Sequence, residues 1–378
     1  MTPPAELLRE AAGRWGTPLY VTDLDAAAAR ARAWQRALPG ALVAYAVKAN
    51  PDPALLRRLA ADGIGFEVVG PVELALALRA GAPPERIVVN GVGQTDADLH
   101  DALATGALVN AESLGALDVL LAAPGRIGLR LNPAIEAGAH PHLATGAANS
   151  KFGIGLDEVP DAVGSARNAG RALESIGAHI GSDVDDVEPF VRLAERLVAI
   201  ARDAGIGRID LGGGYAGDPA AFAVGVGPRL EPGIAVTVEP GRGIVAAAGW
   251  LLTRVVRVQA RGHLVADAGM TELLRPMLYG AHHPVTLLEP ATTIRGAGPW
   301  TLAGPICEAG DLLARDLDLG NEAGEGALLA IGEVGAYGVA MASNYNGRLR
   351  PAQAVIEGRE LRLSRRRETF EDFVARDA

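Results

Sequence analysis

The sequence predicts an α/β protein that combines a parallel (β/α)8 barrel with a carboxy-terminal, mostly-β domain. Up to about residue 250, eight short apolar runs rich in β-branched residues alternate with alanine- and leucine-rich amphipathic segments. Eight such alternations are typical of a closed barrel, whereas the competing doubly wound open sheet rarely needs eight units. Beyond residue 250, strand-like runs are separated by Gly/Pro-rich loops without regular helices between them.

The expected elements follow in chain order. The eight barrel strands are expected at 42–47, 66–69, 86–90, 107–110, 126–131, 176–180, 208–211 and 235–239. Amphipathic helices are expected at 53–61, 71–80, 96–104, 113–122 and 187–204. Later strands are expected at 252–259, 301–302, 327–331 and 354–356, and the early run 18–21 is a candidate extra strand of the same sheet. The expected domain limits are therefore 24–249 for the barrel and 1–23 with 250–378 for the β domain.

Composition excludes several classes of protein. The 378 residues are 49% hydrophobic and 21% charged, enough apolar material for large cores. The formal net charge of −10 disfavours nucleic acid and anionic membranes as partners. No apolar run approaches the roughly 18 residues of a membrane span, and the amino terminus lacks the pattern of a secretory signal. A single cysteine, Cys307, cannot form an intrachain disulfide. These features predict a soluble cytoplasmic enzyme.

Lysine is rare in this chain, which holds two lysines, Lys48 and Lys151, against 33 arginines. Arginine keeps its proton, whereas a lysine amine that loses its proton on burial can attack a carbonyl. Lys48 directly follows an apolar strand, at the end where barrels place functional groups, and a buried amine there would be a nucleophile. Lys151 lies in a polar loop. Lys48 is therefore the candidate nucleophile, and the alternative is that both lysines remain at the surface by chance.

The loops after the seventh and eighth strands carry a candidate phosphate site. Asp210 is followed by Leu211 and three glycines, 212–214, whose backbone N–H groups are free to point at an anion. Glu239 ends the next strand, and barrels usually hold phosphate at these two loops. A carboxylate there can keep the nitrogen of a bound pyridine ring protonated. The alternative for Glu239 is a structural ion pair with an arginine.

Other polar residues carry weaker signals. His179 ends the sixth strand, where its imidazole could stack on a planar ring or be structural. His140 and His142 form a His-x-His pair, but no neighbouring ligand spacing completes a metal site, so we expect no metal. Cys307 and Glu308 belong to the β domain, where a solitary cysteine is usually a small buried hydrophobe.

Together these segments resemble the fold-type III pyridoxal-phosphate-dependent decarboxylases, the class of the ornithine, diaminopimelate and arginine decarboxylases. Nine motifs match in order, and the resemblance extends from Gly16 to Thr369. The motifs are YAVKAN (45–50), HIGS (179–182), DLGGGY (210–215), EPGR (239–242), DAGM (267–270), RPMLYGA (275–281), GPICEAGD (304–311), GAYG (335–338) and MASNYNGRLRP (341–351). The resemblance implies an alanine-racemase-like fold with pyridoxal 5′-phosphate as cofactor.

The resemblance also implies roles for individual residues. Lys48 resembles the lysine that forms a Schiff base with the cofactor, His179 the residue that stacks on the ring, and Glu239 the partner of the pyridine nitrogen. The implied phosphate and cofactor contacts are Ser182, Gly213, Gly214, Gly241, Arg242 and Tyr337. The implied substrate contacts are Arg242, Arg275, Tyr279, Glu308 and Tyr337. Cys307 and Glu308 resemble residues that reach the site of a second subunit, with Cys307 near the reacting carbon, so the implied assembly is a homodimer with shared active sites.

The resemblance is closest to the diaminopimelate decarboxylases, carboxy-lyases of lysine biosynthesis that convert meso-2,6-diaminopimelate to L-lysine and CO2. The sequence departs from that pattern at Glu67, at 70–72 and at His282, so a decarboxylase of another amino acid in siderophore or antibiotic synthesis is an alternative. An amino-acid racemase on the same fold is a further alternative. A cofactor-binding regulator without activity is the alternative outside the enzymes, but the presence of both Lys48 and Cys307 disfavours it.

Overall fold

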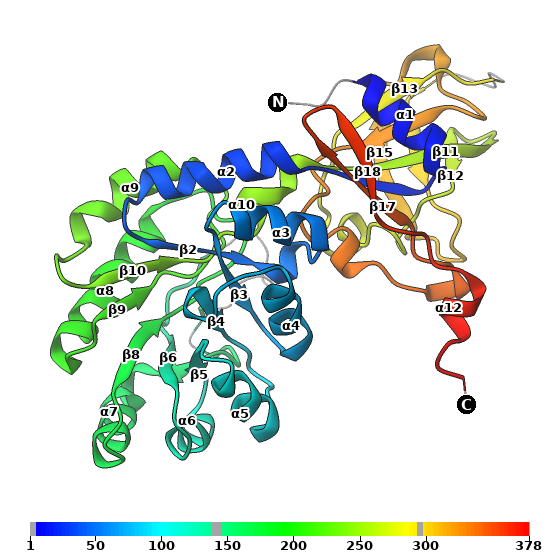
Figure 1. Cartoon of the computed structure of the whole chain (residues 1–378). Coiled ribbons are helices and arrows are strands. Elements are labelled where there is room, and N and C mark those ends of the chain that lie inside the picture. Colours follow the sequence, from blue (N-terminus) through cyan, green and yellow to red (C-terminus); the bar gives the residue numbers. More distant parts are fainter. Residues whose placement is uncertain (1–4, 138–145, 148, 293–297, 378) are drawn as a thin grey trace. The chain divides into compact units, whose positions relative to one another are not determined.

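The chain folds as two compact units, which are described separately: Ala28–Ile244, and Met1–Ala27 with Val245–Ala378. The computed structural model describes residues 5–137, 146–147, 149–292 and 298–377 (Figure 1). Among these described residues, no helix has the length and apolar character needed to span a bilayer. The expected functional domain limits of 24–249 and of 1–23 with 250–378 stay a prediction.

The unit Ala28–Ile244 contains a closed ring of eight parallel strands. Each strand pairs with the next in chain order, and the last pairs with the first, with Thr237 opposite Leu42. The ring consists of β2 (Leu42–Ala46), β3 (Gly65–Val68), β4 (Ile87–Val89), β5 (Leu108–Ala111), β6 (Arg126–Asn132), β8 (Leu173–Gly177), β9 (Arg208–Asp210) and β10 (Ala235–Val238). The short β7 (Ile154–Gly155) pairs with β6 outside the ring. The predicted parallel (β/α)8 barrel is confirmed.

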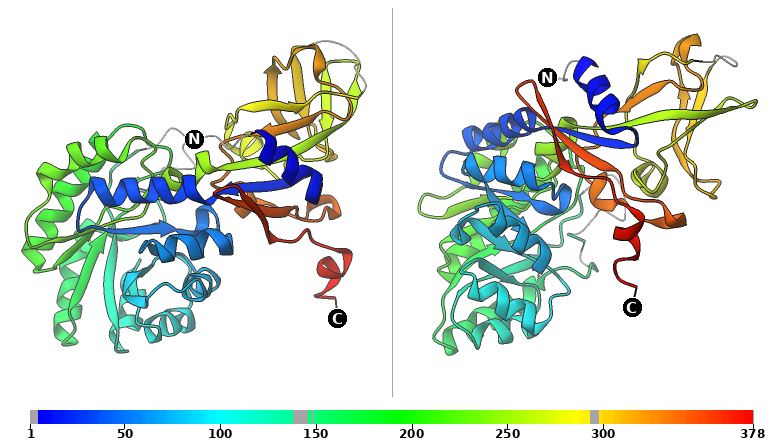
Figure 2. Two further views of the ribbon diagram at one scale, coloured as in Figure 1. Left: turned by 45° about the horizontal axis from the view of Figure 1, so that its top comes forward. Right: turned by 45° about the vertical axis from the view of Figure 1, so that its right-hand side comes forward.

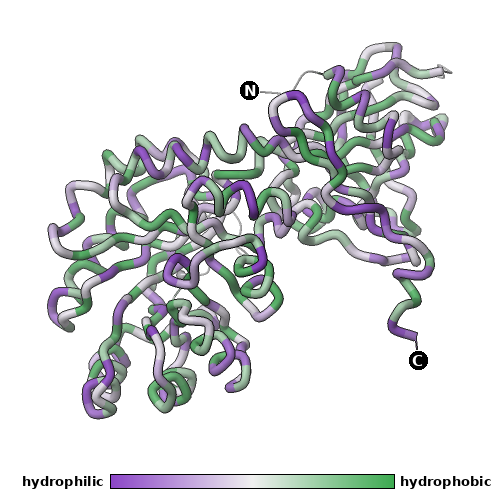
Figure 3. Tube along the Cα trace, in the orientation of Figure 1, coloured by the Kyte–Doolittle hydropathy of each residue, from purple (hydrophilic) through white to green (hydrophobic). Residues whose placement is uncertain are grey.

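Helices surround the strands of this unit, as Figure 2 shows from two further directions. They are α2 (Leu24–Ala37, which begins in the other unit), α3 (Pro53–Ala61), α4 (Pro71–Arg79), α5 (Asp96–Ala104), α6 (Leu114–Leu121), α7 (Val159–Asn168), α8 (Glu188–Ala204), α9 (Pro219–Val226) and α10 (Arg242–Val245). Hydrophilic and hydrophobic residues alternate along many of them in Figure 3, the pattern of helices that bury one face. The five predicted helices are confirmed to within one residue at each end. We did not predict α7 and α9, because an internal glycine and a proline in each lower the helical signal.

Helix ends in the barrel follow local chemistry. Asp52 precedes α3 and accepts hydrogen bonds from the backbone N–H groups of Ala54 and Leu55, with Pro53 at the first helical position. At the other end of α8, Gly205 adopts a left-handed conformation with φ of 73° and ends the helix. Short 3-10 turns lie at Val47–Ala49 (η1), Pro84–Arg86 (η2), Leu156–Glu158 (η4) and Gly227–Arg229 (η5).

The second unit is built on a nine-stranded mixed sheet. The strands are β1 (Leu19–Asp23), β11 (Gly249–Gln259), β12 (His263–Ala266), β13 (Val285–Glu289), β14 (Trp300–Ala303), β15 (Leu312–Leu317), β16 (Leu328–Ile331), β17 (Ala352–Glu357) and β18 (Glu360–Arg365). The expectation that the run 18–21 joins this sheet is confirmed, because β1 pairs antiparallel with β11 and parallel with β17. A buried cluster that includes Leu251, Trp300 and Leu329 packs on the sheet.

This unit contains little helix, as expected of a mostly-β domain. Its helices are α1 (Ala5–Trp15), α11 (Arg275–Tyr279) and α12 (Phe370–Val374), and its 3-10 turns are Ala246–Ala248 (η6), Gly320–Glu322 (η7), Val339–Met341 (η8) and Tyr345–Gly347 (η9). Helix α1 packs its buried leucines Leu7 and Leu8 into an apolar cluster with Leu19 and Trp250.

Candidate active site

A cavity of about 460 Å³ lies at the carboxyl end of the barrel strands. Its lining combines a lysine, two glutamates, a histidine and an arginine with apolar and glycine residues. The lining residues are Lys48, Glu67, Val69, Gly70, Pro71, Gly91, Val92, Gly93, Gln94, Asp98, Arg130, Phe152, His179 and Glu239. All of them belong to the unit Ala28–Ile244, so the barrel alone brings these side chains together.

Lys48 lies in η1, directly after β2, and forms an ion pair with the carboxylate of Glu67 from β3. The expected burial of the Lys48 amine is not observed: the Lys48 side chain is 32% exposed, whereas that of Glu67 is 2% exposed. The difference arises because the lysine reaches from the strand end into an open cavity rather than into the packed interior of the barrel. Lys151, in contrast, is exposed beside Phe152, with its amine 5.3 Å from the ring centre.

Glu239 follows β10 and is buried at the base of the cavity. One of its oxygens, Oε1, accepts a hydrogen bond of 2.8 Å from Nδ2 of Asn90, so the alternative of an ion pair with an arginine is not what holds it. Burial and the neighbouring carboxyl groups of Asp210 and Glu67 raise the pKa of Glu239 well above its ordinary value. Burial also raises the pKa of Asp210 to about 6, and the two carboxyl groups hydrogen bond to each other.

His179 is held in one neutral tautomer. Its Nδ1 accepts a hydrogen bond of 3.1 Å from the backbone N–H of Gly213, which leaves the ring proton on Nε2. Burial, with the positive charges of Lys48 and Arg130, lowers the pKa of His179 well below its ordinary value. An uncharged imidazole that lines the cavity provides a flat face for a planar ligand.

The three glycines 212–214 allow the loops after β8, β9 and β10 to touch. A Cβ at Gly213 would lie 2.2 Å from the carbonyl oxygen of Glu239, and one at Gly214 would lie 1.9 Å from that of Gly181. Gly212 and Gly214 also have φ of 64° and 99°, which side chains rarely adopt. No other residue type fits this backbone cradle, which ends next to the half-buried Ser182.

Gly241 and Arg242 border the same loops. A Cβ at Gly241 would meet the side chains of Ala46 and Ala49 at about 3 Å, on either side of Lys48. Arg242, the first residue of α10, lies 3.6 Å from the carboxylate of Asp183, measured from Nε to Oδ1. The structure therefore brings together, within one unit, the expected residues Lys48, His179, Ser182, Gly213, Gly214, Glu239, Gly241 and Arg242.

The remaining expected residues belong to the other unit. Arg275, in α11, is buried, and its guanidinium carbon lies 5.4 Å from the ring centre of Tyr279 and 5.9 Å from that of Tyr337. Cys307 is an exposed free thiol, contrary to the usual preference of solitary cysteines for the interior. The adjacent Glu308 is also exposed, and its Oε1 accepts a hydrogen bond of 2.7 Å from the hydroxyl of Tyr345.

A buried carboxylate braces the loop that carries Cys307. Asp311 accepts hydrogen bonds from the backbone N–H groups of Ile306, at 2.8 Å, and Met270, at 2.6 Å. Gly304 and Gly269 pack so closely on this carboxylate that a Cβ at either would lie within 2.7 Å of its oxygens. The thiol is thus presented on a loop whose base is fixed, rather than on a freely moving one.

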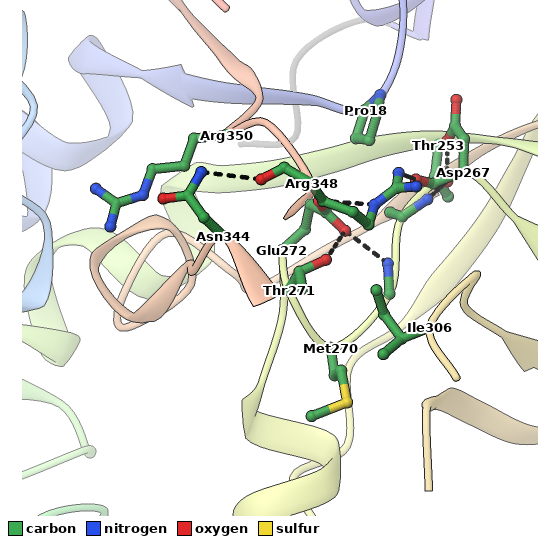
Figure 4. Close-up of polar contacts among 12 residues, drawn as sticks. Pro18, Thr253, Asp267, Met270, Thr271, Glu272, Ile306, Asn344, Arg348 and Arg350 are labelled. Atoms are coloured by element: carbon green, nitrogen blue, oxygen red, sulfur yellow. Dashed lines mark hydrogen bonds and ion pairs between the residues drawn. The ribbon is translucent and has the colours of Figure 1, made fainter. Parts of the chain in front are cut away.

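A second polar network supports the segment that carries Tyr345. Figure 4 shows Asn344, Arg348, Asp267 and Glu272 in one group. The Asn344 amide donates to the carbonyl of Arg348 at 2.9 Å, and the Arg348 guanidinium donates to the carbonyl of Asp267 at 2.5 Å. The Asp267 side chain in turn accepts from the hydroxyl of Thr253 at 2.6 Å.

Within the part of the chain that the structure describes, no cluster of His, Cys, Asp and Glu side chains could hold a metal ion. His140 and His142 lie outside the described residues, so the expectation that they form no metal site stays a prediction.

Several polar residues that line the cavity or contact its lining were not among the expected site residues. Glu67 was noticed only as a departure from a motif, and Asn90, Asn110, Glu112 and Arg130 were not singled out. Arg130 donates to Glu112 at 2.8 Å and lies 4.9 Å from the ring centre of Phe152. A usable signal was present, because each of these residues is a polar residue at or just beyond the carboxyl end of an apolar barrel strand.

Comparisons with known proteins agree with this geometry. A family model described as "Pyridoxal-dependent decarboxylase, pyridoxal binding domain" matches residues 24–246. The diaminopimelate decarboxylase of Deinococcus radiodurans is 43% identical to this chain, and the alignment covers 97% of each protein. That of Aquifex aeolicus is 38% identical, and the alignment covers 97% of this chain and 93% of the relative. The crystal structure of the Helicobacter pylori diaminopimelate decarboxylase complexed with L-lysine superposes with a TM-score of 0.92 at 32% identity, covering 98% of this chain and 99% of that one. A lysine/ornithine decarboxylase of Vibrio vulnificus, with a TM-score of 0.82 at 22% identity, shares the fold.

The buried Glu239 predicts a pH-dependent cost in stability. Its pKa is raised in the folded protein, so above about pH 4.5 the unfolded chain releases a proton that the folded, ligand-free protein retains. The contribution of Glu239 to the free energy of unfolding is therefore most favourable at low pH, where the carboxyl group is protonated in both states, and it becomes less favourable as the pH rises. We expect Glu239→Gln to stabilise the ligand-free protein at pH 8 by roughly 1–3 kcal/mol, and by much less at pH 5. Urea unfolding at both pH values measures this difference.

The exposed Glu195 of α8 provides the control. It forms a surface ion pair with Arg229, so Glu195→Gln should change stability by less than about 1 kcal/mol, without a trend between pH 5 and 8. A Glu239→Gln protein that is destabilised equally at both pH values would show that the folded state does not resist ionisation of this carboxyl.

Proposed function

The chain belongs to the pyridoxal-dependent decarboxylases, and from that premise we propose that it removes one carboxylate of meso-2,6-diaminopimelate as CO2 and releases L-lysine. The observation that carries this proposal is the likeness over the full length of both units to proteins named diaminopimelate decarboxylase, at 36–43% identity. A carboxy-lyase that takes an amino-acid substrate is also what the chemistry of the cavity suits, because it joins an amine, a buried carboxyl and a backbone cradle.

The residues of the barrel fit pyridoxal 5′-phosphate. We assign its phosphate to the loops that glycines 212–214 bring together, although, contrary to the sequence expectation, the N–H groups of Gly212 and Gly213 donate to Asp210 and His179 rather than pointing at an anion. Glu239 is a buried carboxyl, and pairing with a cationic ring nitrogen would offset the cost of ionising it there. When bound, the cofactor supplies an electron sink for the carbanion that is left after CO2 departs. Lys48 provides the amine for the covalent link, and the neutral His179 faces the cavity without adding a positive charge to those of Lys48 and Arg130.

Chemistry at the far end of the substrate supports the choice of diaminopimelate. Its distal carbon carries both a carboxylate and an ammonium group, which suit a guanidinium and a carboxylate respectively. We propose that Arg275, Tyr279, Tyr337 and Arg242 serve the carboxylate side and that Glu308 serves the ammonium group. The hydrogen bond from Tyr345 holds Glu308 in one orientation, which favours such a role.

We further propose a cytoplasmic homodimer with two shared active sites. Cys307, near the reacting carbon, and Glu308 would be supplied by the second subunit, and the functional domains would be 24–249 and 1–23 with 250–378. The exposure of Cys307 and Glu308 on a braced loop is consistent with contact to another molecule. Since a two-fold axis makes both sites equivalent, each dimer would have two complete sites.

A decarboxylase of another amino acid is the second candidate function. Gly70 and Pro71 line the cavity, and the neighbouring Val72 is 73% exposed. The decarboxylases resembled above usually have Ser-Gly-Gly at these three positions, so the departure favours a change at the substrate's side chain rather than in the reaction.

One assay separates these functions. The purified protein with pyridoxal phosphate should release CO2 and lysine from meso-diaminopimelate, with ornithine, arginine and the LL isomer as control substrates. Because a substrate without the distal carboxylate leaves a guanidinium unpaired, we expect diaminopimelate to be preferred by about 100-fold or more in kcat/KM. Equal turnover of ornithine would reject diaminopimelate as the substrate and retain the decarboxylase class. Inversion at the α-carbon without CO2 would indicate a racemase.

The two lysines of the chain provide an internal comparison for the covalent link. Borohydride reduces an imine to a stable amine, so treatment of the pyridoxal phosphate complex should attach the cofactor to the peptide that contains Lys48. Peptide mass spectrometry should find no label at the exposed Lys151. Label at Lys151 would contradict the assignment. So would an active preparation in which the peptide that contains Lys48 carries no label.

Subunit mixing tests the shared site. Lys48→Ala and Cys307→Ala should each be nearly inactive alone, but half of the dimers in a fully exchanged mixture should be heterodimers with one intact site. Activity should then recover to about a quarter of wild type. As a control, Lys48→Ala mixed with Glu239→Gln should not recover, because both changes lie in the same unit and every site would carry one of them. Absence of recovery in the first mixture after verified exchange would reject the shared site.

A further inference from the structure

Three carboxyl groups are buried together at the carboxyl end of the barrel. Glu67, Asp210 and Glu239 are 1%, 3% and 5% exposed. Lys48 pairs with Glu67, and the hydrogen bond between Asp210 and Glu239 requires a shared proton. Buried like charges repel strongly, so ionised Glu239 needs hydrogen-bond donors that compensate for the lost water.

Asn90 supplies such donors. It directly follows β4 and is itself 4% exposed. Its Nδ2 lies 2.8 Å from Oε1 of Glu239 and 3.4 Å from Oε1 of Glu67. One amide nitrogen carries two protons, so Asn90 bridges the carboxylate that pairs with Lys48 and the carboxyl group at the base of the cavity. A hydrogen bond to a charged acceptor is stronger than one to a neutral acceptor.

The orientation of the Asn90 amide is fixed from the opposite side. Nδ2 of Asn110, from β5, donates to Oδ1 of Asn90 at 2.9 Å. A flipped Asn90 would aim its oxygen at two carboxyl groups and lose this bond, so its nitrogen faces Glu239 and Glu67. The backbone is held as well, because the Asn90 N–H donates to the carbonyl of Val68 at 2.8 Å and its carbonyl accepts from Gln94 at 2.7 Å.

We propose that Asn90 is a positioning residue for the reaction: its amide nitrogen bridges Glu239 and Glu67, and thereby keeps Glu239 ionised and oriented toward the ring nitrogen of bound pyridoxal phosphate. This inference rests on the cofactor of the proposed function but not on its substrate. A neutral amide suits the task, because it donates two hydrogen bonds without adding charge. An aspartate would add a fourth carboxyl group, and a lysine would compete with Lys48 for Glu67.

Asn90→Leu keeps the branching and the number of side-chain heavy atoms but removes both hydrogen bonds to the carboxyl groups, and Asn90→Ala is a second, smaller variant. Thr237→Val is the control: Thr237 is also buried, in β10, two residues before Glu239, and its hydroxyl accepts a hydrogen bond from Arg208 at 3.3 Å, whereas the Asn90 amide donates to Glu239 and Glu67. Cofactor-free unfolding midpoints establish that each variant folds, and we expect the losses in stability to be comparable among the three.

The decisive measurement is the 15N chemical shift of the ring nitrogen after reconstitution with ring-labelled pyridoxal phosphate. In wild type and Thr237→Val the signal should be that of a protonated ring nitrogen. In both Asn90 variants it should move toward the unprotonated value, because the ring's proton passes to a less stabilised carboxylate. We also expect kcat to fall about 10- to 100-fold while KM changes less than about threefold, and the acid limb of the kcat profile to move up by about one pH unit.

A wild-type ring-nitrogen signal in a folded Asn90 variant would overturn the proposal, as would an equal change in Thr237→Val. The test of the proposed substrate is independent of this measurement. A wild-type protein that does not decarboxylate diaminopimelate, combined with a shifted ring-nitrogen signal in the Asn90 variants, would reject the substrate and support the role of Asn90.

Discussion

The ion pair between Lys48 and Glu67 is the contact on which the rest of the cavity depends. It places a positive charge at the carboxyl end of the barrel, where Asp210 and Glu239 are also buried. The charge of Lys48 lowers the pKa of Glu239, against burial and neighbouring carboxyl groups that raise it, and it contributes to keeping His179 neutral. Burial is the larger cause of both pKa shifts, and the charge of Lys48 modifies them in groups that come from several separate strands.

The buried carboxyl groups of the barrel lower the stability of the ligand-free protein. Burying a carboxyl group such as Glu239, whose pKa is raised, costs free energy in the ligand-free protein, as does confining three carboxyl groups in one region. A cationic ring nitrogen would relieve that cost, because its positive charge is complementary to the buried carboxyl groups. Sites that are strained or electrostatically unfavourable when empty are common in enzymes, because the binding partner supplies the missing compensation.

The sheet unit holds two exposed side chains in place through hydrogen bonds to their loop and to one of them. The buried Asp311 accepts a hydrogen bond from the backbone of Ile306, next to the exposed Cys307. The hydroxyl of Tyr345 donates a hydrogen bond to the exposed Glu308. Buried hydrogen bonds to backbone N–H groups give an exposed loop a defined shape without covering its tip. Exposed yet braced side chains are suited to act on a group that the unit itself does not bind.

The sequence by itself determined the order and nature of the elements. Hydrophobic periodicity located seven of the eight barrel strands and five of the helices to within one residue at each end; the sixth strand was expected at 176–180 but lies at Leu173–Gly177, so His179 follows it rather than ending it. Local motifs singled out Lys48, His179 and Glu239, because strand ends and glycine runs are features of consecutive residues. Only the tertiary structure decided which side chains meet. That Asn90 bridges Glu239 and Glu67, across 149 and 23 residues of chain, follows from closure of the barrel, since a ring of parallel strands brings every carboxyl end to one rim. A pattern of neighbouring residues holds no information about contacts between residues so far apart in the chain. Neither the amide bridge nor the partial exposure of Lys48 could therefore be predicted from the sequence.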